Sequence, residues 1–215
     1  VSWLKEFPSG RAIFNFIEER FPQGKWGRSI DELLLKRRDV EFEIFSEVER
    51  HNVMPNIKDG FQSVDDFIKY ANSVANRRKS RAGTSLELHL ESIFRYEHLR
   101  FESQVITEQN KKPDFVFPSG KDYHNPQFPE TKLHMLASKT CCKDRWRQVI
   151  SEADRIKPKH LFTLQQGVSS NQLTEMYENG IILVVPQPIV ASFPEDYRSK
   201  IMNLTGFVDF IKTSQ

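Results

Sequence analysis

The chain has 215 residues, 38% of them hydrophobic, which suffices for one ordinary domain or for a core with a helical subdomain. The formal net charge of only +2 excludes a chain that is basic throughout, so any contact with nucleic acid must come from a local patch. The adjacent Cys141 and Cys142 predict neither a disulfide framework nor a zinc site. Because these cysteines imply no disulfide, we expect a protein of the reducing cytoplasm. No apolar run approaches the length of a membrane span, and no signal peptide is recognisable.

The first part of the chain carries apolar side chains at helical spacing. We predict a helix over residues 8–22 and further helices that begin at Ser29, Ser63 and Thr84. Ser29 and Thr84 each open a capping box, in which a hydroxyl residue is followed three positions later by an acid. Between these starts we expect a loop over residues 51–60 and a break at Gly83.

From residue 102 onwards the apolar spacing changes to that of β-strands. Strands are predicted over residues 103–107, 114–117, 133–139, 160–164 and 181–185. Helices are predicted over residues 143–156, 170–179 and 194–213. The predicted fold class is therefore α/β, with a central mixed sheet flanked by helices and an N-terminal helical region.

Three charged residues between Lys112 and Asp154 suggest a site. Asp114 heads one apolar run, Lys139 ends the next, and Glu152 lies on the predicted helix that follows. Magnesium takes oxygen ligands and uses one or two carboxylates, while a lysine beside it stabilises a phosphate. The arrangement predicts a metal-dependent phosphodiesterase site. The non-catalytic alternatives are that Asp114 is a solvated acid at a strand end and that Glu152 forms a surface salt bridge.

Two basic stretches could contact nucleic acid. The first holds Arg77, Arg78, Lys79 and Arg81, and it either binds phosphate or completes a helix dipole. The second runs from Lys139 to Lys159, and within it Lys143-Asp144-Arg145 lies at the start of a predicted helix. Two cations at a helix N-terminus oppose the dipole, so an anionic partner is favoured there over a merely solvated helix start.

The acid and the lysine resemble the PD-(D/E)xK nuclease pattern, with one departure. Two residues before Lys139, where that pattern has its second acid, stands Ala137. Glu152 would replace that acid, which resembles the branch of restriction endonucleases that includes NgoMIV and EcoRII. Longer blocks, in order over nearly the whole chain, are similar to the catalytic domain of the EcoRII restriction endonuclease family; they lie at residues 76–83, 85–91, 110–115, 142–148 and 159–165.

The resemblance implies a role for each matching residue. Asp114 and Glu152 would bind Mg²⁺, and Lys139 would be the catalytic lysine. Glu87 would support the metal site from the helical layer, although its place in the capping box allows a purely structural role. Tyr123 would lie near the active site, or would simply fill a loop pocket.

The same resemblance implies a DNA-binding surface. Lys143, Asp144 and Arg145 would read base edges in the major groove, where arginine pairs with guanine and aspartate accepts from cytosine. The family recognises 5′-CCWGG, in which W is A or T, and relatives flip the central bases out of the stack. Arg38 is our first choice for stacking on an extruded base and Arg37 the second. The remaining predicted DNA contacts are Arg77, Arg78 and Arg81.

The implied protein is a type II site-specific deoxyribonuclease of a restriction-modification system that leaves 5′-phosphates. Residues 1–83 would form a helical region that packs on the core and contributes to DNA contacts, and residues 84–215 the endonuclease core of one catalytic domain. A palindromic site implies a homodimer, and a full-length protein could add an N-terminal effector domain. The alternatives are a structure-specific repair or recombination nuclease and a catalytically inactive DNA-binding module.

Overall fold

The computed structural model describes residues 7–25 and 29–215, except for the side chain of Asp144. Over these residues the chain forms two compact units. The first comprises residues 7–25 and 33–89, and the second comprises residues 29–32 and 90–215. The boundary between residues 89 and 90 falls inside helix α3 (Val64–Tyr96), and so does the division that we expect between residues 83 and 84.

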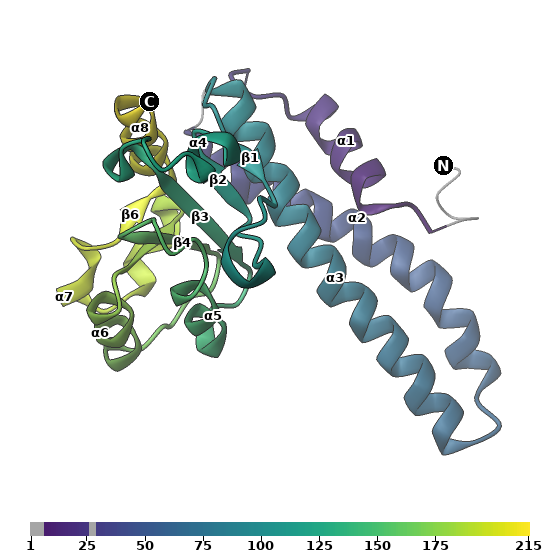
Figure 1. Cartoon of the computed structure of the whole chain (residues 1–215). Helices are drawn as coiled ribbons and strands as arrows, with labels where there is room; N and C mark the ends of the chain where they lie inside the picture. The colour runs from purple at the N-terminus through teal and green to yellow at the C-terminus, as the bar shows by residue number, and fades with distance from the viewer. Residues whose placement is uncertain (1–6, 26–28) are drawn as a thin grey trace. The chain divides into compact units, whose positions relative to one another are not determined.

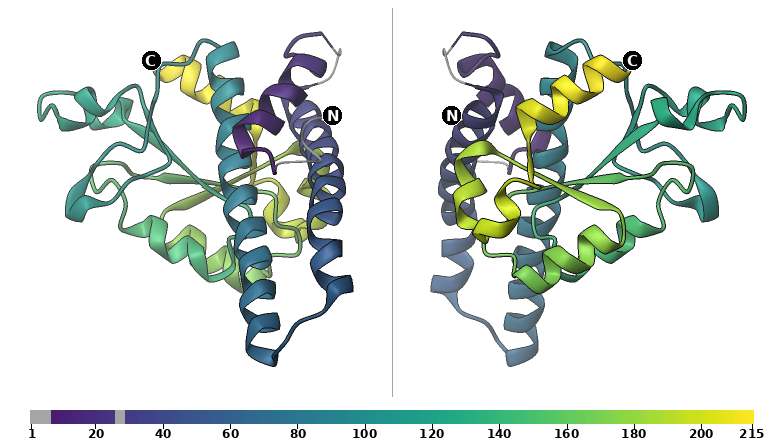
Figure 2. Two further views of the ribbon diagram at one scale, coloured as in Figure 1. Left: turned by 90° about the vertical axis from the view of Figure 1, so that its right-hand side faces the viewer. Right: turned by 90° about the vertical axis from the view of Figure 1, so that its left-hand side faces the viewer.

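The described part of the first unit is helical. It contains α1 (Gly10–Arg20), most of α2 (Ile30–Asp59) and most of α3. In Figures 1 and 2, α2 and α3 run in opposite directions and are joined by a short connection. The hydroxyl of Ser29 accepts from the amide of Glu32 at 3.2 Å, and that of Ser63 accepts from the amide of Asp66 at 3.1 Å. The predicted helix starts at these two serines are confirmed.

The predicted loop over residues 51–60 is wrong. Helix α2 continues to Asp59 with Pro55 inside it. The side-chain amide of Asn52 donates to the carbonyl of Val48 at 2.8 Å within this stretch. Gly60 follows the last helical residue with φ +78°, the left-handed conformation in which a glycine ends many helices.

The predicted break at Gly83 and the helix start at Thr84 are also wrong, because α3 passes through both without interruption. A glycine inside a helix costs roughly 1 kcal/mol relative to alanine. Leu86 and Leu90, both fully buried, continue the apolar face of α3 beyond Gly83. Burying a leucine stabilises by about 1.5–3 kcal/mol, which is more than the glycine costs. The bland capping role considered for Glu87 therefore does not apply.

A six-stranded sheet forms the centre of the second unit. Its strands, in spatial as in sequence order, are β1 (Glu102–Ser103), β2 (Phe115–Phe117), β3 (His134–Lys139), β4 (Lys159–Thr163), β5 (Ile181–Val185) and β6 (Met202–Asn203). Neighbours from β1 to β3 are antiparallel, and neighbours from β3 to β6 are parallel. The predicted mixed sheet is confirmed, although β1 stops at Ser103 because Gln104 has a left-handed φ of +57°.

Helices lie on both faces of this sheet (Figures 1 and 2). The helices of the second unit, besides the end of α3, are α4 (Gly120–His124), α5 (Trp146–Ile150), α6 (Ser170–Glu178), α7 (Glu195–Arg198) and α8 (Leu204–Ser214). Trp146 of α5 and Leu173 of α6 pack with Leu161 in one core cluster. On the other face, Phe94 of α3 and Phe207 of α8 pack on Phe117 of β2, at 5.4 and 5.7 Å between ring centroids.

Two of the predicted helices in this unit are shorter than expected. The helix predicted over residues 143–156 ends at Ile150 and is preceded by the 3-10 turn η4 (Lys143–Arg145). The helix predicted over 194–213 is divided into α7 and α8 by β6, which pairs with β5. The buried carboxylate of Asp31 accepts from the amides of Leu204 and Thr205, both at 3.0 Å, and so fixes the start of α8. None of the helices in the described ranges is long and apolar enough to cross a membrane.

Candidate functional site

Adjacent strands of the sheet bring Asp114 and Lys139 together. Phe115 faces Leu136 in the antiparallel β2–β3 register, so Asp114, directly before β2, lies beside the end of β3. Its Oδ2 accepts from Lys139 Nζ at 3.0 Å and from the amide of Ser138 at 2.7 Å. Gln104 Nε2 donates to Oδ1 at 3.3 Å. Both side chains of the ion pair are largely buried, with exposed fractions of 10% and 12%.

Glu152 approaches this pair from a turn rather than from a helix, because α5 ends before it. The next residue, Ala153, has a left-handed φ of +49°, which is uncommon for a residue with a side chain. The buried Lys159, first residue of β4, donates to the carbonyl of Ala153 at 2.9 Å and also to that of Glu152. This lysine therefore ties the turn that carries Glu152 to the sheet.

The carboxyl group of Glu152 has an incomplete set of partners. Its Oε2 is buried without a hydrogen-bond partner among the described residues. Burial raises the pKa of Glu152; the charge of Lys139 acts in the opposite direction, and that of Asp114 adds to the rise. A carboxylate oxygen that is buried without a partner needs a cation or a proton, and the nearby Asp114 offers further carboxylate oxygens.

Two carboxylates fit the number that magnesium usually takes from a protein. The described residues hold no group of three or more His, Cys, Asp or Glu side chains arranged to bind a metal. The unpartnered Glu152 oxygen and the neighbouring Asp114 carboxylate are oxygen donors of the kind that such an ion takes.

Tyr123 lies behind the Glu152 turn. Its buried hydroxyl donates to both oxygens of Glu108, at 2.7 and 2.6 Å. Glu108 in turn accepts from the amide of Asp154 at 3.2 Å. Burial and the Glu108 carboxylate raise the pKa of Tyr123, so its hydroxyl stays protonated at neutral pH. The tyrosine reaches the candidate site through this chain of contacts.

The predicted base-reading segment is the turn η4. Lys143 and Arg145 are exposed there, whereas the side chain of Asp144 lies outside what the structure describes. Gln165 Oε1 accepts from the amides of Cys142 at 2.8 Å and Lys143 at 3.1 Å, which satisfies donors at the start of the turn. Trp146 is buried immediately after it. The segment thus presents two cations on an anchored turn.

Several basic residues of the first unit are already engaged within it. Arg37 is buried and its Nε donates to the carbonyl of Phe21 at 2.7 Å, which makes it a packing residue in this structure. Arg78 binds both carboxylate oxygens of Glu49. Arg77 and Arg81 lie over the ring of Phe7. The sequence alone did not show these partners, since they are distant along the chain.

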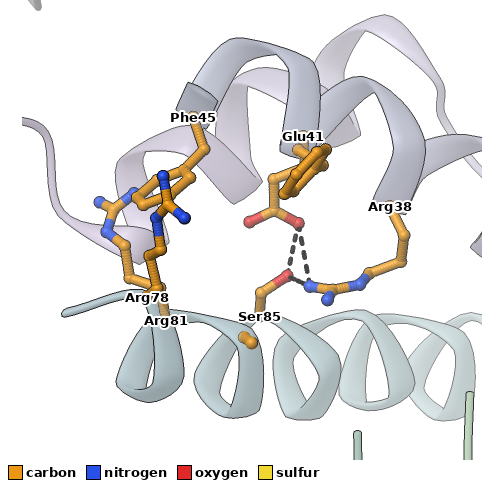
Figure 3. Close-up of a pocket in the computed structure, with 8 residues that line it drawn as sticks. Arg38, Glu41, Phe45, Arg78, Arg81 and Ser85 are labelled. Atoms are coloured by element: carbon orange, nitrogen blue, oxygen red, sulfur yellow. Dashed lines mark hydrogen bonds and ion pairs between the residues drawn. The ribbon is translucent and has the colours of Figure 1, made fainter. Parts of the chain in front are cut away.

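Arg38 lies in a pocket between α2 and α3 (Figure 3). The cavity has a volume of about 200 Å³. Its lining consists of Arg38, Glu41, Phe42, Phe45, Arg78, Arg81, Ala82 and Ser85. Phe42, one helical turn after Arg38, is 70% exposed, although large apolar side chains are usually buried. This surface is therefore a candidate contact for a ligand.

Comparison with known proteins places these features in a family. The model of the EcoRII C-terminal family matches residues 45–208. The chain belongs to that family. It is 52% identical over 207 residues to the type II restriction enzyme EcoRII of Escherichia coli, covering 96% of this chain and 51% of that protein. The chain thus spans about half the length of this relative of the EcoRII C-terminal family.

Solved structures show the same fold as this EcoRII C-terminal family member. One is the restriction endonuclease PspGI in complex with substrate DNA, with a TM-score of 0.77 and 18% identity, covering 99% of this chain and 95% of that one. Another is metal-depleted Ecl18kI with uncleaved, modified DNA, with a TM-score of 0.76 and 18% identity, covering 98% and 78%. The restriction-endonuclease-like α/β fold predicted from the sequence is confirmed.

Within this EcoRII C-terminal family member, the structure brings together Asp114, Lys139 and Glu152. Glu87 lies half-buried on the part of α3 that belongs to the first unit, and its support of the metal site stays a prediction. Sequence reasoning missed Glu108, and it counted Lys159 only as part of the second basic stretch. A signal for the role of Lys159 in the site was present, because a lysine that begins a buried strand needs a specific partner.

Proposed function

We propose that the chain is the catalytic domain of a type II restriction endonuclease, which hydrolyses both strands of duplex DNA at a specific site. The observation that carries this proposal is the Asp114–Lys139 ion pair beside the unpartnered oxygen of Glu152. If the Asp114–Lys139 ion pair served only the stability of the fold, it would not need the charged Glu152 beside it. A half-buried acid with one fully buried, unsatisfied oxygen destabilises the fold unless a proton or a cation completes it.

In this proposal Asp114 and Glu152 hold Mg²⁺. When bound, the ion polarises the phosphate and lowers the pKa of a water molecule. Lys139 places an ammonium group next to Asp114, where it stabilises the negative charge that grows on the phosphate oxygens. Lys159 holds the backbone of the Glu152 turn, so that this carboxylate stays within the electrostatic influence of Lys139 and Asp114.

Specificity comes from the turn η4. Exposed Lys143 and Arg145 support base readout in the major groove, where arginine reads guanine, and Asp144 completes the triplet by accepting from cytosine. We propose 5′-CCWGG as the site, with 5′-phosphate products. Because that site is palindromic, two copies of the chain would each cut one strand as a homodimer in the cytoplasm, where the DNA lies.

The pocket of the first unit supports base extrusion at the central pair. Arg38 offers a planar guanidinium for stacking, and exposed Phe42 an aromatic ring one turn away. A cavity of roughly 150 Å³ takes a benzene ring, so the pocket, at about 200 Å³, has room for one planar base.

In the full-length protein, a separate N-terminal effector domain would regulate this catalytic domain.

The test is a digest of a plasmid of known sequence with magnesium, followed by mapping of the fragment ends. Asp114→Ala is the inactive variant, and Asp209→Ala, which removes an exposed acid of α8, is the matched control. Discrete fragments that end at CCWGG and can be religated support the proposal. Fragments at another fixed site overturn the specificity alone, whereas cutting only at branched DNA favours a repair nuclease. If the protein binds the duplex without cutting it, the domain is a DNA-binding module.

A further inference from the structure

Glu41 is a buried acid in the pocket of the first unit for which the proposed function has no use. It lies on α2 and is only 7% exposed. Its Oε2 accepts from the hydroxyl of Ser85, lies 2.8 Å from His89 Nε2 and lies 3.6 Å from Arg38 Nη1. One carboxylate oxygen therefore has three polar neighbours. Figure 3 shows Glu41 and Arg38 reaching from α2 toward Ser85 on α3.

The protonation states of this cluster follow from its contacts. Burial alone would raise the pKa of Glu41, but hydrogen bonds from His89 and Ser85 and the charge of Arg38 outweigh it and lower the pKa. Burial lowers the pKa of His89. At neutral pH the acid is therefore ionised and the imidazole neutral. Because Glu41 accepts, the imidazole proton lies on Nε2, and Nδ1 has no partner among the described residues.

Arg38 is held from two helices by this cluster. Its Nη1 donates to the Ser85 hydroxyl on α3 and faces the Glu41 carboxylate on α2. The side chain is 19% exposed, so most of its length is packed and one part borders the pocket. A guanidinium held by two acceptors has its plane fixed, and stacking depends on that plane.

The pocket favours a neutral planar group over a phosphate. The charge of Arg38 is balanced by Glu41, and that of Arg78 by Glu49, whose two oxygens accept from Arg78 Nε at 3.0 and 2.8 Å. Arg81 lies over the ring of Phe45 at 5.0 Å. The arginines are thus neutralised or stacked, and Phe42 and Phe45 supply apolar surface. A phosphate would find one uncompensated charge there, that of Arg81, whose guanidinium already lies over an aromatic ring.

We propose that Glu41, supported by Ser85 and His89, is the positioning residue that fixes the plane of the Arg38 guanidinium, against which one extruded base stacks. This inference rests on the proposed function, and in particular on base extrusion into this pocket. Its own content is that a carboxylate without direct contact to DNA controls the stacking group. The ligand class is a single neutral nucleobase.

The test uses a CCWGG duplex that carries 2-aminopurine at the central adenine, because this base becomes fluorescent when it leaves the stack. The rise in fluorescence on binding is measured without metal, and cleavage is measured with magnesium. We compare the natural chain with Glu41→Gln, Arg38→Ala and the variant that combines both. Glu43→Gln, which changes an exposed acid of the same helix, is the matched control.

Glu41→Gln should reduce both the fluorescence rise and the cleavage rate roughly tenfold, since a hydrogen bond to a charged group is lost. The combined variant should be no worse than Arg38→Ala alone, because Glu41 acts through Arg38. Glu43→Gln should behave like the natural chain. A purely structural role for Glu41 would lower the melting temperature and leave the fluorescence rise of the folded fraction unchanged.

Two outcomes separate this inference from the function on which it rests. If Arg38→Ala keeps the full fluorescence rise, the pocket does not hold the base, and base extrusion there is overturned together with the inference. If Arg38→Ala abolishes the fluorescence rise while Glu41→Gln behaves like Glu43→Gln, only the role of Glu41 is overturned. The same holds if the loss in the combined variant is the sum of the losses in Glu41→Gln and Arg38→Ala. Should Glu41→Gln fail to fold, Ser85→Ala replaces it, because it removes the hydroxyl that both Arg38 and Glu41 contact, and the same two results decide.

Discussion

The strand-end site of the second unit and the helical pocket of the first unit both place a carboxylate beside a cation, but they differ in how fully the charges are satisfied. In the pocket, Glu41 Oε2 has Ser85, His89 and Arg38 around it. At the strand ends, Asp114 is paired with Lys139, while Glu152 Oε2 has no partner among the described residues. Glu41, whose charge is satisfied, is suited to orient a neighbouring side chain, whereas Glu152, whose oxygen is not, is suited to bind a ligand.

The comparison has an energetic meaning. A satisfied buried charge cluster holds its side chains in one arrangement, which suits the recognition of a flat base. A buried carboxylate without a partner costs free energy in the isolated fold, and binding a cation there recovers that free energy. Removing the cation, the unsatisfied acid or the lysine that supports its turn therefore tests each part of the strand-end site separately.

The largest expected effect comes from Lys139→Met. It removes the ammonium group that stabilises charge on the phosphate, so we expect a loss of about 10³-fold in the cleavage rate. DNA affinity should remain nearly unchanged, since the two exposed cations of η4, Lys143 and Arg145, are kept. Single-turnover cleavage and gel retardation measure the two quantities. Lys132→Met, at an exposed lysine, is the control, and equal losses in both variants would refute a special role for Lys139.

Glu152→Gln tests the unsatisfied oxygen directly. The neutral amide costs less to bury than an ionised carboxylate, so the metal-free variant should be at least as stable as the natural chain. Magnesium should raise the melting temperature of the natural chain and not that of the variant. Cleavage should fall by more than about 10²-fold. Glu178→Gln, at an exposed acid of α6, should retain both the metal response and the activity.

The contrast between the two sites also shows how far sequence reasoning reached. Asp114 and Lys139 were predicted because each lies at one end of an apolar run, and sheet register brings these two into contact. Glu152 was predicted as the acid that replaces the one missing at Ala137. The β2 to β5 strands were predicted from such apolar runs. Periodicity and local turn signals carry this information, since it is contained within a few neighbouring residues.

The partners of Glu41 could not be predicted in the same way. Ser85 and His89 lie more than forty residues away, on the opposite helix, and their contacts depend on how α2 pairs with α3. Local signals also misled at Gly83, where burial of the next helical turn outweighs the cost of glycine. Packing between distant segments decides such cases.

Lys159→Met tests whether the backbone of the turn that carries Glu152 must be held in place. The lysine donates to the carbonyls of Glu152 and Ala153, and the latter residue is held at φ +49°. Losing two hydrogen bonds from a charged donor should let this turn relax and reduce cleavage by roughly 100-fold. The apparent magnesium affinity, measured by titration calorimetry, should fall as well. Lys157→Met, at an exposed lysine two residues earlier, should change neither quantity, and unaltered magnesium affinity in Lys159→Met would contradict a positioning role.

The smallest expected effect concerns His160, a buried histidine of β4 that follows Lys159 in the chain. His160 packs on Phe207 and Phe210, and burial, together with the neighbouring His134, lowers its pKa to about 4. The unfolded chain has a histidine pKa near 6.5 and therefore binds a proton first as the pH falls. Stability contributed by neutral His160 is thus complete above pH 6.5 and is lost as the pH approaches 4, by about 2 kcal/mol at pH 5.

His160→Gln keeps a hydrogen-bond donor but cannot titrate, so its free energy of unfolding should change less between pH 7 and pH 5 than that of the natural chain. Urea unfolding at several pH values measures the difference. His124→Gln, at an exposed histidine, should retain the natural pH dependence. If all three proteins lose equal stability on acidification, His160 is not the group responsible. His160 also extends the comparison, because it is neutral and packed against aromatic rings. Burial disfavours the charged form of a titratable group, so such a group can stay neutral in the core with neither an ion-pair partner nor a ligand.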